Sequence, residues 1–175
     1  MIETKLKAAI RDIPDFPKPG ILFKDITPIL KDAVLCAEIV DAFVIQLKDV
    51  EIDVIAGIES RGFLFGLMLA NRLNVPFVPI RKQGKLPFKK IQQPCELEYG
   101  SAILELHVDA ILPGQKVLIH DDLLATGGTV NAATRLIQQL NGEIAGYAFV
   151  ISLDFLKGKE TLKQQTSNIV SLISF

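Results

Sequence analysis

The chain has 175 residues, 49% of them hydrophobic, which is enough for one full core, and we expect a single domain over residues 1–175. A net charge of −1 and a pI of about 6.1 argue against a general nucleic-acid binder. Residues 1–13 are too charged for a secretory signal and the most apolar run, residues 62–70, is too short to cross a bilayer, so we expect a cytoplasmic protein without a membrane partner.

The N-terminal part combines helical patterns with a proline-rich arm. Apolar residues at helical spacing predict a short amphipathic helix over residues 2–12. Three prolines and a glycine in residues 12–20 then force an extended arm, and an apolar segment with charges in its middle follows at residues 21–28. Asp32 is suited to cap the next helix, in whose pattern Cys36 is expected as a buried thiol rather than a metal ligand.

The next segment predicts a strand, a turn and a helix. Residues 53–58 are apolar and suit a first central strand, residues 59–62 form the turn, and residues 63–71 continue as a helix. Arg61 in this turn is a candidate for binding phosphate together with backbone N–H groups. The alternative is that Glu59 and Arg61 merely form a surface pair. Residues 75–80 suit another strand, provided that its two prolines lie at its ends.

Residues 81–105 change in character. Residues 81–85 are basic, with Gly84 as a hinge, and residues 95–106 alternate in a way that suggests a hairpin. A basic, hinged loop in a near-neutral protein suits a lid over a polyanion, while a solvated charged hairpin is the alternative. We expect a flexible catalytic loop over about residues 81–105.

The most specific motif lies at residues 117–129, Val-Leu-Ile-His-Asp-Asp-Leu-Leu-Ala-Thr-Gly-Gly-Thr. An apolar strand is expected to stop at Asp121 and Asp122, and the small residues 125–129 form a turn before a helix over 130–140. Free N–H groups, the helix dipole and glycines make such a turn an anion site. The two carboxylates would repel a bare phosphate, so they imply a ribose diol, a divalent cation or both, and hard oxygen ligands indicate Mg²⁺.

The remaining chain completes an α/β pattern. Residues 144–153 suit a strand, residues 157–164 a short helix or loop, and residues 169–175 a terminal edge strand. Alternating strands and helices predict a twisted, mainly parallel sheet with helices on both faces. Ligands bind such sheets at the C-terminal ends of the strands, where the turns after Ile58, Ile80 and Asp122 should converge.

Taken together, these motifs resemble the adenine phosphoribosyltransferases, a family of type I phosphoribosyltransferases, over nearly the whole chain. Residues 16–28 are similar to the family's adenine-side segment, residues 59–63 to its pyrophosphate loop and residues 81–87 to its flexible loop. Residues 97–100 resemble the acid that follows, and residues 117–129 the motif for phosphoribosyl pyrophosphate (PRPP). The resemblance implies the type I phosphoribosyltransferase fold with a small hood over about residues 1–33, and a homodimer.

The implied reaction is adenine plus PRPP giving AMP and diphosphate, with Mg²⁺, in purine salvage. The resemblance implies that the PRPP-binding residues are Ser60, Arg61, Lys82, Lys85, Asp121, Asp122, Ala125, Thr126, Gly127, Gly128 and Thr129. The adenine-binding residues are then Leu22, Phe23, Lys24 and Leu123. Mg²⁺ would be held mainly through PRPP and water, near Asp121 and Asp122.

The resemblance also implies that the catalytic residues are Glu98, Arg61 and Lys85. Glu98 would relay a proton with adenine N7 as N9 attacks, and Tyr99 beside it would close over the reacting centre. A surface carboxylate is the alternative for Glu98, and a register slip would exchange it with Glu96 or Glu105.

Three residues depart from the family pattern. Lys24 stands where arginine is usual, so a planar forked contact becomes a point charge. Gln83 takes a place that is often basic, and His120 replaces an aliphatic residue at the end of a strand, where a structural role is expected. The peptide bond between Glu59 and Ser60 is expected to be cis, as in the family.

Two other functions compete with this hypothesis. One is a phosphoribosyltransferase for a different base, which a substrate assay would decide. The other is a non-catalytic sensor of PRPP or a nucleotide. Sensors of this kind carry an additional winged-helix domain, for which this chain has no spare length.

Overall fold

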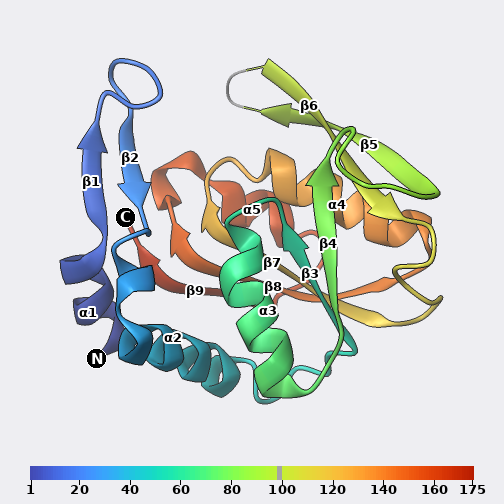
Figure 1. Ribbon diagram of the computed structural model, residues 1–175, viewed down its shortest axis with the longest axis horizontal. Coiled ribbons are helices and arrows are strands. Elements are labelled where there is room, and N and C mark those ends of the chain that lie inside the picture. Colours follow the sequence, from blue (N-terminus) through green and yellow to red (C-terminus); the bar gives the residue numbers. More distant parts are fainter. Residues whose placement is uncertain (98–99) are drawn as a thin grey trace.

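A central sheet of seven strands organises the protein, whose computed structural model describes residues 1–97 and 100–175 (Figure 1). The order across the sheet is β5-β6-β4-β3-β7-β8-β9. The neighbours among β4, β3, β7, β8 and β9 are parallel, whereas β6 pairs antiparallel with both β4 and β5. The strand bounds are β3 Val54–Ile58, β4 Phe77–Lys82, β5 Lys90–Leu97, β6 Gly100–His107, β7 Lys116–Leu124, β8 Glu143–Ser152 and β9 Ile169–Ser174. The mainly parallel sheet is confirmed.

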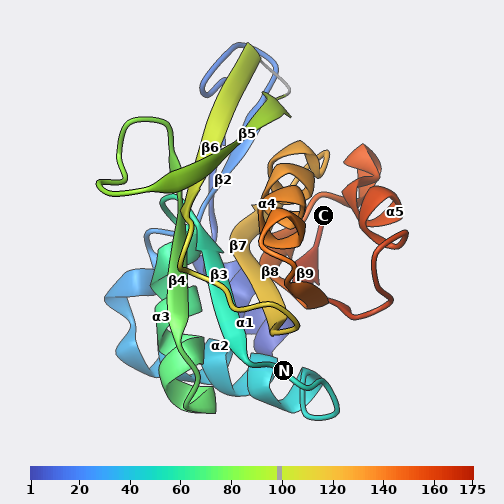
Figure 2. The same ribbon diagram turned by 90° about the vertical axis from the view of Figure 1, so that its right-hand side faces the viewer.

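Helices cover both faces of this sheet, as Figure 2 shows from the side. Their bounds are α1 Ile2–Ala9, α2 Ala33–Gln46, α3 Gly62–Leu73, α4 Gly128–Gln139 and α5 Gly158–Leu162, with short 3-10 turns at Ile29–Lys31 and Asp154–Leu156. Two hydrophobic clusters result: one joins the sheet to α1, α2 and α3, and the other joins it to α4 and α5. All five residues of β3 are buried, as expected for a parallel strand covered on both faces.

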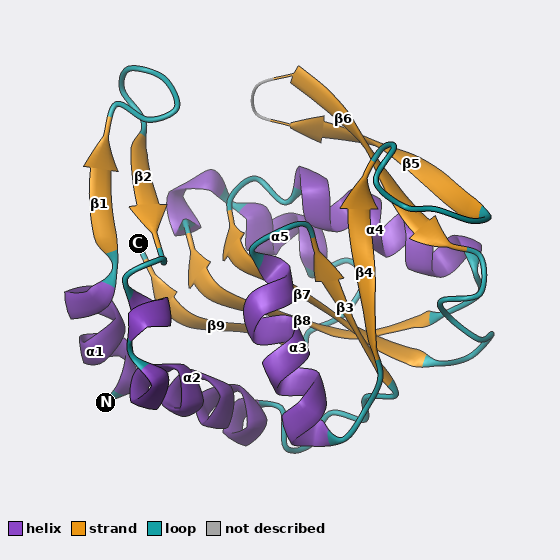
Figure 3. Ribbon diagram, in the orientation of Figure 1, coloured by secondary structure: helices purple, strands orange, loops and turns teal. Residues whose placement is uncertain are grey.

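The N-terminal arm forms a separate two-stranded antiparallel hairpin, β1 Arg11–Pro14 and β2 Leu22–Asp25. Its turn is closed by the backbone N–H of Gly20, which donates to the Asp15 carboxylate at 2.7 Å. Figure 3 shows this hairpin and the β5–β6 hairpin projecting above the central sheet at opposite sides. The second hairpin is confirmed. The extended arm expected over residues 12–20 is extended only as far as Pro14, because Asp15 and Gly20 have positive φ and the chain turns between them.

Local signals in the sequence were accurate at several other places. The Asp32 carboxylate caps α2 by accepting from the N–H groups of Val34 and Leu35, both at 3.0 Å. Cys36 is a buried free thiol, and β9 is the last strand at one edge of the sheet. None of the helices in the described ranges is long and apolar enough to span a membrane.

Two expectations about strands are wrong. Pro79 lies inside β4 rather than at its end; because β4 pairs with β6 only at Arg81 and Lys82, the missing N–H of Pro79 leaves no bond of the sheet unmade. β7 does not stop at Asp121 but runs on to Leu124, since β8 pairs alongside it as far as Ser152.

Candidate active site

A cavity of about 260 Å³ opens at the C-terminal ends of the parallel strands. It is lined by residues from four of the predicted segments together: Glu59, Ser60, Arg61, Lys82, Cys95, Ala102, Leu104, Asp121, Asp122, Leu123, Ala125 and Thr129. β3 and β7 are direct neighbours in the sheet, so the turns that follow them meet at this edge. The convergence expected from the sequence is therefore present.

The close approach of α3 to β7 depends on Gly62, the first residue of α3. A Cβ atom at Gly62 would lie 2.8 Å from the carbonyl oxygen of His120 and 3.1 Å from the Cα of Asp121. Only glycine lets the start of α3 pack against β7 at this distance. The helix can therefore bring Arg61 directly beside the carboxylate pair.

Arg61 forms an ion pair with Asp122, with 3.0 Å between Nε and Oδ2. The Arg61 guanidinium also lies over the ring of Phe23, 4.9 Å from its centroid. This contact connects the N-terminal hairpin to the cavity, because Phe23 belongs to β2. The alternative of a surface pair between Glu59 and Arg61 is wrong: each residue pairs with a different partner.

The carboxylates of Asp121 and Asp122 differ in their surroundings. Burial raises the pKa of Asp121 well above its usual value, and the charge of Asp122 raises it further. Burial also raises the pKa of Asp122, although the charge of Arg61 opposes this. The backbone N–H of Asp122 donates to Oδ1 of Asp121 at 2.8 Å. A cation or hydroxyl donors in the cavity would stabilise the ionised form of both groups.

Residues 125–127 form the turn between β7 and α4, and the helix begins at Gly128, two residues earlier than expected. Gly127 has φ of +89°, a conformation that favours glycine, and it caps the helix. α5 supports the turn from behind, where a Cβ on Gly158 would lie only 2.2 Å from the carbonyl oxygen of Ala125. The turn thus leaves the first N–H groups of α4 without intrahelical partners, as an anion site requires.

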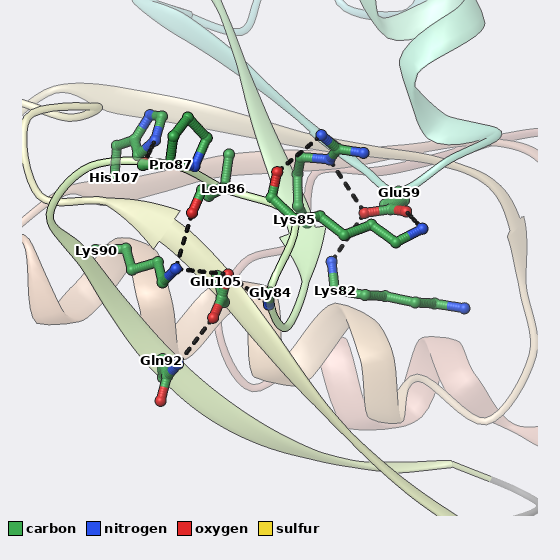
Figure 4. A network of polar contacts seen from close by, with 11 residues as sticks. Glu59, Lys82, Gly84, Lys85, Leu86, Pro87, Lys90, Gln92, Glu105 and His107 are labelled. Atoms are coloured by element: carbon green, nitrogen blue, oxygen red, sulfur yellow. Dashed lines mark hydrogen bonds and ion pairs between the residues drawn. The ribbon is translucent and has the colours of Figure 1, made fainter.

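Glu59 is an important part of the site that the sequence did not reveal. Its side chain is 6% exposed and forms ion pairs with Arg81 at 3.2 Å and Lys85 at 2.9 Å. It also accepts a hydrogen bond from the backbone N–H of Lys82 at 2.9 Å (Figure 4). Burial would raise the pKa of Glu59, but these contacts outweigh it and lower the pKa overall. Glu59 therefore holds the side chains of Arg81 and Lys85 beside the cavity.

Three other residues of the cavity wall were also not predicted from the sequence. Ala102 and Leu104 reach the cavity from β6, and Cys95 reaches it from β5, with its Sγ 3.7 Å from Oγ1 of Thr129. The alternation of β6 could have suggested Ala102 and Leu104, which lie two residues apart and thus share one face. Nothing local in the sequence indicates which strand faces the cavity.

The predicted base-side residues all lie in the described part of the chain. Leu22 is half-exposed, and Phe23 packs edge-on against Phe16 with 5.2 Å between ring centroids. The ammonium of Lys24, in contrast, lies 2.7 Å from the Asp12 carboxylate and 3.9 Å from the centroid of the Phe175 ring. The Lys24 side chain therefore contacts Asp12 and Phe175, whereas the Phe23 ring contacts Arg61.

Several remaining expectations can be compared with the structure. The peptide bond between Glu59 and Ser60 is cis, as expected. His120 is fully buried and edge-on to Phe43, which agrees with a structural role. The proposed acid/base Glu98 and its neighbour Tyr99 lie outside the described residues.

Comparison with known proteins agrees with this geometry. The sequence model of the family described as phosphoribosyl transferase domain matches residues 29–173, so the chain is a phosphoribosyltransferase-domain protein. An adenine phosphoribosyltransferase of Cytophaga hutchinsonii is 51% identical over 100% of this chain and 97% of its own length. The crystal structure of the Thermoanaerobacter pseudethanolicus enzyme superposes with a TM-score of 0.95 at 48% identity, and covers all of both chains.

A third relative carries ligands. The Saccharomyces cerevisiae adenine phosphoribosyltransferase, 43% identical and with a TM-score of 0.90 over 98% of both chains, was crystallised with adenine and an imino-altritol bisphosphate. Similarity at this level spans the whole chain. This protein therefore belongs to the adenine phosphoribosyltransferase family.

Proposed function

We propose that the protein transfers the phosphoribosyl group of PRPP to adenine, giving AMP and diphosphate. One observation carries the proposal: a single cavity combines an anion-binding turn, a carboxylate pair and the cations Arg61 and Lys82. PRPP presents a 5′-phosphate, a ribose diol and a diphosphate in that order. Each group has a partner of suitable chemistry along the cavity wall.

The assignment of roles follows from these chemistries. Residues 125–129 hold the 5′-phosphate through backbone N–H groups and the hydroxyls of Thr126 and Thr129. Asp121 and Asp122 accept hydrogen bonds from the ribose hydroxyls. Diphosphate is held by Ser60, Arg61 and Lys82, which line the cavity, and by Lys85, which pairs with Glu59 in the cavity wall. For Lys85 this requires an exchange of its Glu59 partner for a phosphate oxygen.

The base site lies where the N-terminal hairpin meets the cavity. Phe23 and Leu123 supply apolar surfaces suited to the two faces of a neutral planar base, and the exposed strand segment at Leu22 offers backbone hydrogen-bonding groups. Lys24 supports this segment through Asp12 and Phe175. Specificity for adenine then comes from backbone groups that match its ring edge.

The chemistry exchanges one bond at C1′ of the ribose for another. The bond from C1′ to the diphosphate oxygen breaks, and the bond from N9 of adenine to C1′ forms on the opposite face. Arg61, Lys82 and Lys85 stabilise the charge that develops on the departing diphosphate, which is the electrostatic part of catalysis. Glu98 is assigned the proton relay at N7 of adenine.

The residues present fit Mg²⁺ as an ion bound chiefly through the substrate. Within the described ranges no three metal-ligating side chains gather, yet two carboxylates line the cavity. Mg²⁺ is commonly bound by one or two carboxylates together with substrate phosphates and water. Asp121 and Asp122 would hold it there, and the ion would neutralise charge on PRPP.

The decisive experiment is a diphosphate-release assay with PRPP and Mg²⁺, with each of adenine, hypoxanthine, guanine, xanthine, orotate and uracil supplied separately. We expect turnover with adenine alone, and loss of turnover on chelation of Mg²⁺. Turnover with another base would overturn the base assignment. Binding of PRPP without any turnover would favour the sensor hypothesis. The homodimer, the purine-salvage role and the cytoplasmic location remain predictions.

A further inference from the structure

The connection between β4 and β5 must cross the face of another strand. β6 lies between β4 and β5 in the sheet, so residues 83–89 pass over β6 on their way to the edge. Glu105 lies on β6 beneath this crossing, with Arg81 of β4 and Gln92 of β5 as its neighbours in register. Its side chain is only 1% exposed. A buried carboxylate in this position requires partners.

Those partners all come from the crossing segment and the strand that follows it. The Glu105 carboxylate accepts from the backbone N–H of Gly84 at 3.1 Å and from Nε2 of Gln92 at 2.8 Å. It also pairs with the ammonium of Lys90 at 3.5 Å, which in turn donates to the carbonyl oxygen of Leu86 at 2.8 Å (Figure 4). One carboxylate thus holds the crossing segment at its beginning, and through Lys90 at its middle.

The contacts of Glu105 outweigh the cost of its burial. Burial would raise the pKa of Glu105, but the hydrogen bonds from Gln92 and Gly84 and the charge of Lys90 lower it overall. The carboxylate is therefore ionised at neutral pH. Ionised acceptors form stronger hydrogen bonds than neutral ones, so the hold on Gly84 is firm.

The segment that Glu105 holds follows Lys82 directly and contains Lys85. Gly84, at φ of +82°, turns the chain between Lys82, which lines the cavity, and Lys85, which pairs with Glu59 in the cavity wall. Glu105 does not line the cavity itself, whereas its neighbour Leu104 does, as alternation along a strand requires. Any effect of Glu105 on a ligand must therefore pass through the loop.

We propose that Glu105 is a positioning residue whose buried carboxylate fixes the Gly84 turn and thereby aims Lys82 and Lys85 at the diphosphate of PRPP. The proposal rests on the proposed function. Glu105 touches neither substrate, so its effect falls on PRPP and not on adenine. Loss of the carboxylate would let residues 83–89 sample other conformations, and part of the binding energy of PRPP would then be spent on ordering them.

The kinetic test compares Glu105→Gln with the wild type and with Glu143→Gln, which changes an exposed carboxylate at the start of β8. We expect KM for PRPP to rise about tenfold in Glu105→Gln, as for the loss of charged hydrogen bonds. KM for adenine at saturating PRPP should stay within about twofold of wild type, and Glu143→Gln should change neither. Equal effects on both substrates, or none on either, would overturn the proposal.

A second test does not depend on turnover. The crossing segment contains Lys85 and Lys89 and is flanked by Arg81, Lys82 and Lys90, so trypsin can report its order by mass spectrometry of the first cleavage products. We expect Glu105→Gln to be cut there several times faster than wild type or Glu143→Gln, with the same thermal midpoint for the rest of the molecule. If Glu105→Gln were cleaved at the same rate as the wild type, the proposal that Glu105 orders the segment would be wrong. If the wild type lacked turnover with adenine and PRPP, only the proposed function would fail, because this comparison would still stand.

Discussion

Arg61 and Asp122 form an ion pair, 3.0 Å from Nε to Oδ2, that joins the turn after β3 to the neighbouring parallel strand β7. The Asp122 side chain is 4% exposed, so its charge has little help from solvent. Arg61 therefore has two effects from one position: its charge favours the ionised form of Asp122, and its guanidinium presents donors to the cavity. Both depend on the glycine that follows it.

The first prediction concerns Arg61. We expect Arg61→Gln to lower kcat/KM for PRPP about 100-fold, because a forked cation is lost from the diphosphate end and Asp122 loses its partner. Arg61→Lys should recover only part of this, since an ammonium cannot make the forked contact. Arg72→Gln is the matched control, because the Arg72 pair with Asp41 lies on the exposed side of α3. Wild-type kinetics in Arg61→Gln would contradict the assignment.

The second prediction concerns Gly62. Its added Cβ would meet backbone atoms of β7 that cannot rotate away, so Gly62→Ala should lower the free energy of unfolding by about 1–3 kcal/mol. The usual gain of about 1 kcal/mol for alanine over glycine in a helix opposes this only in part. Leu67→Ala, half-exposed on the same helix, serves as the control in urea unfolding. A stabilised Gly62→Ala variant would disprove the close approach.

The third prediction is a pH dependence that originates from His120. Burial lowers the pKa of His120 to about 4, and the backbone of Ala148 only partly offsets this. Because the unfolded pKa is near 6.5, the unfolded chain takes up the proton first as the pH falls. The stabilisation is complete above pH 6.5 and is lost down to about pH 4, at a cost of about 3 kcal/mol.

The measurement is urea unfolding of the wild type and of His120→Leu at several pH values between 7 and 4. Subtracting the two free energies of unfolding removes the contribution of the carboxylates that both proteins share, among them Glu59 and Glu105, whose lowered pKa values also cost stability as the pH falls. As the pH falls from 7 to 4, we expect the free energy of unfolding to decrease less in His120→Leu than in the wild type. Parallel curves for the two proteins would rule out a buried neutral His120.

The fourth prediction concerns the C-terminal residue. Phe175 lies beneath the Lys24 ammonium, and Lys24 is on the strand that also carries Leu22 and Phe23. Removing the ring in Phe175→Ala should raise KM for adenine by up to about tenfold, as expected for a buried cation–π contact, and leave KM for PRPP unchanged. Phe155→Ala, at an exposed position in the 3-10 turn Asp154–Leu156, is the control. An unchanged KM for adenine would remove Phe175 from the support of the base site.

The sequence by itself determined which segments form the site. The glycine-rich turn, the carboxylate pair and the cap at Asp32 are local patterns, as is each single strand or helix of the α/β alternation, since each depends on spacing within about a dozen residues. Their convergence also followed, because parallel strands place the turns after them at one edge of the sheet. For the same reason Arg61 could be placed near Asp122 before any contact was known.

Only the tertiary structure decided how the charges pair. Glu59 binds Lys85 and Arg81 instead of Arg61, and Lys24 binds Asp12 and Phe175, because strand order and the N-terminal hairpin bring distant segments together. The hold of Glu105 on Gly84 exists because β6 inserts between β4 and β5. Long-range pairing depends on which strand lies beside which, and no spacing along the chain specifies that.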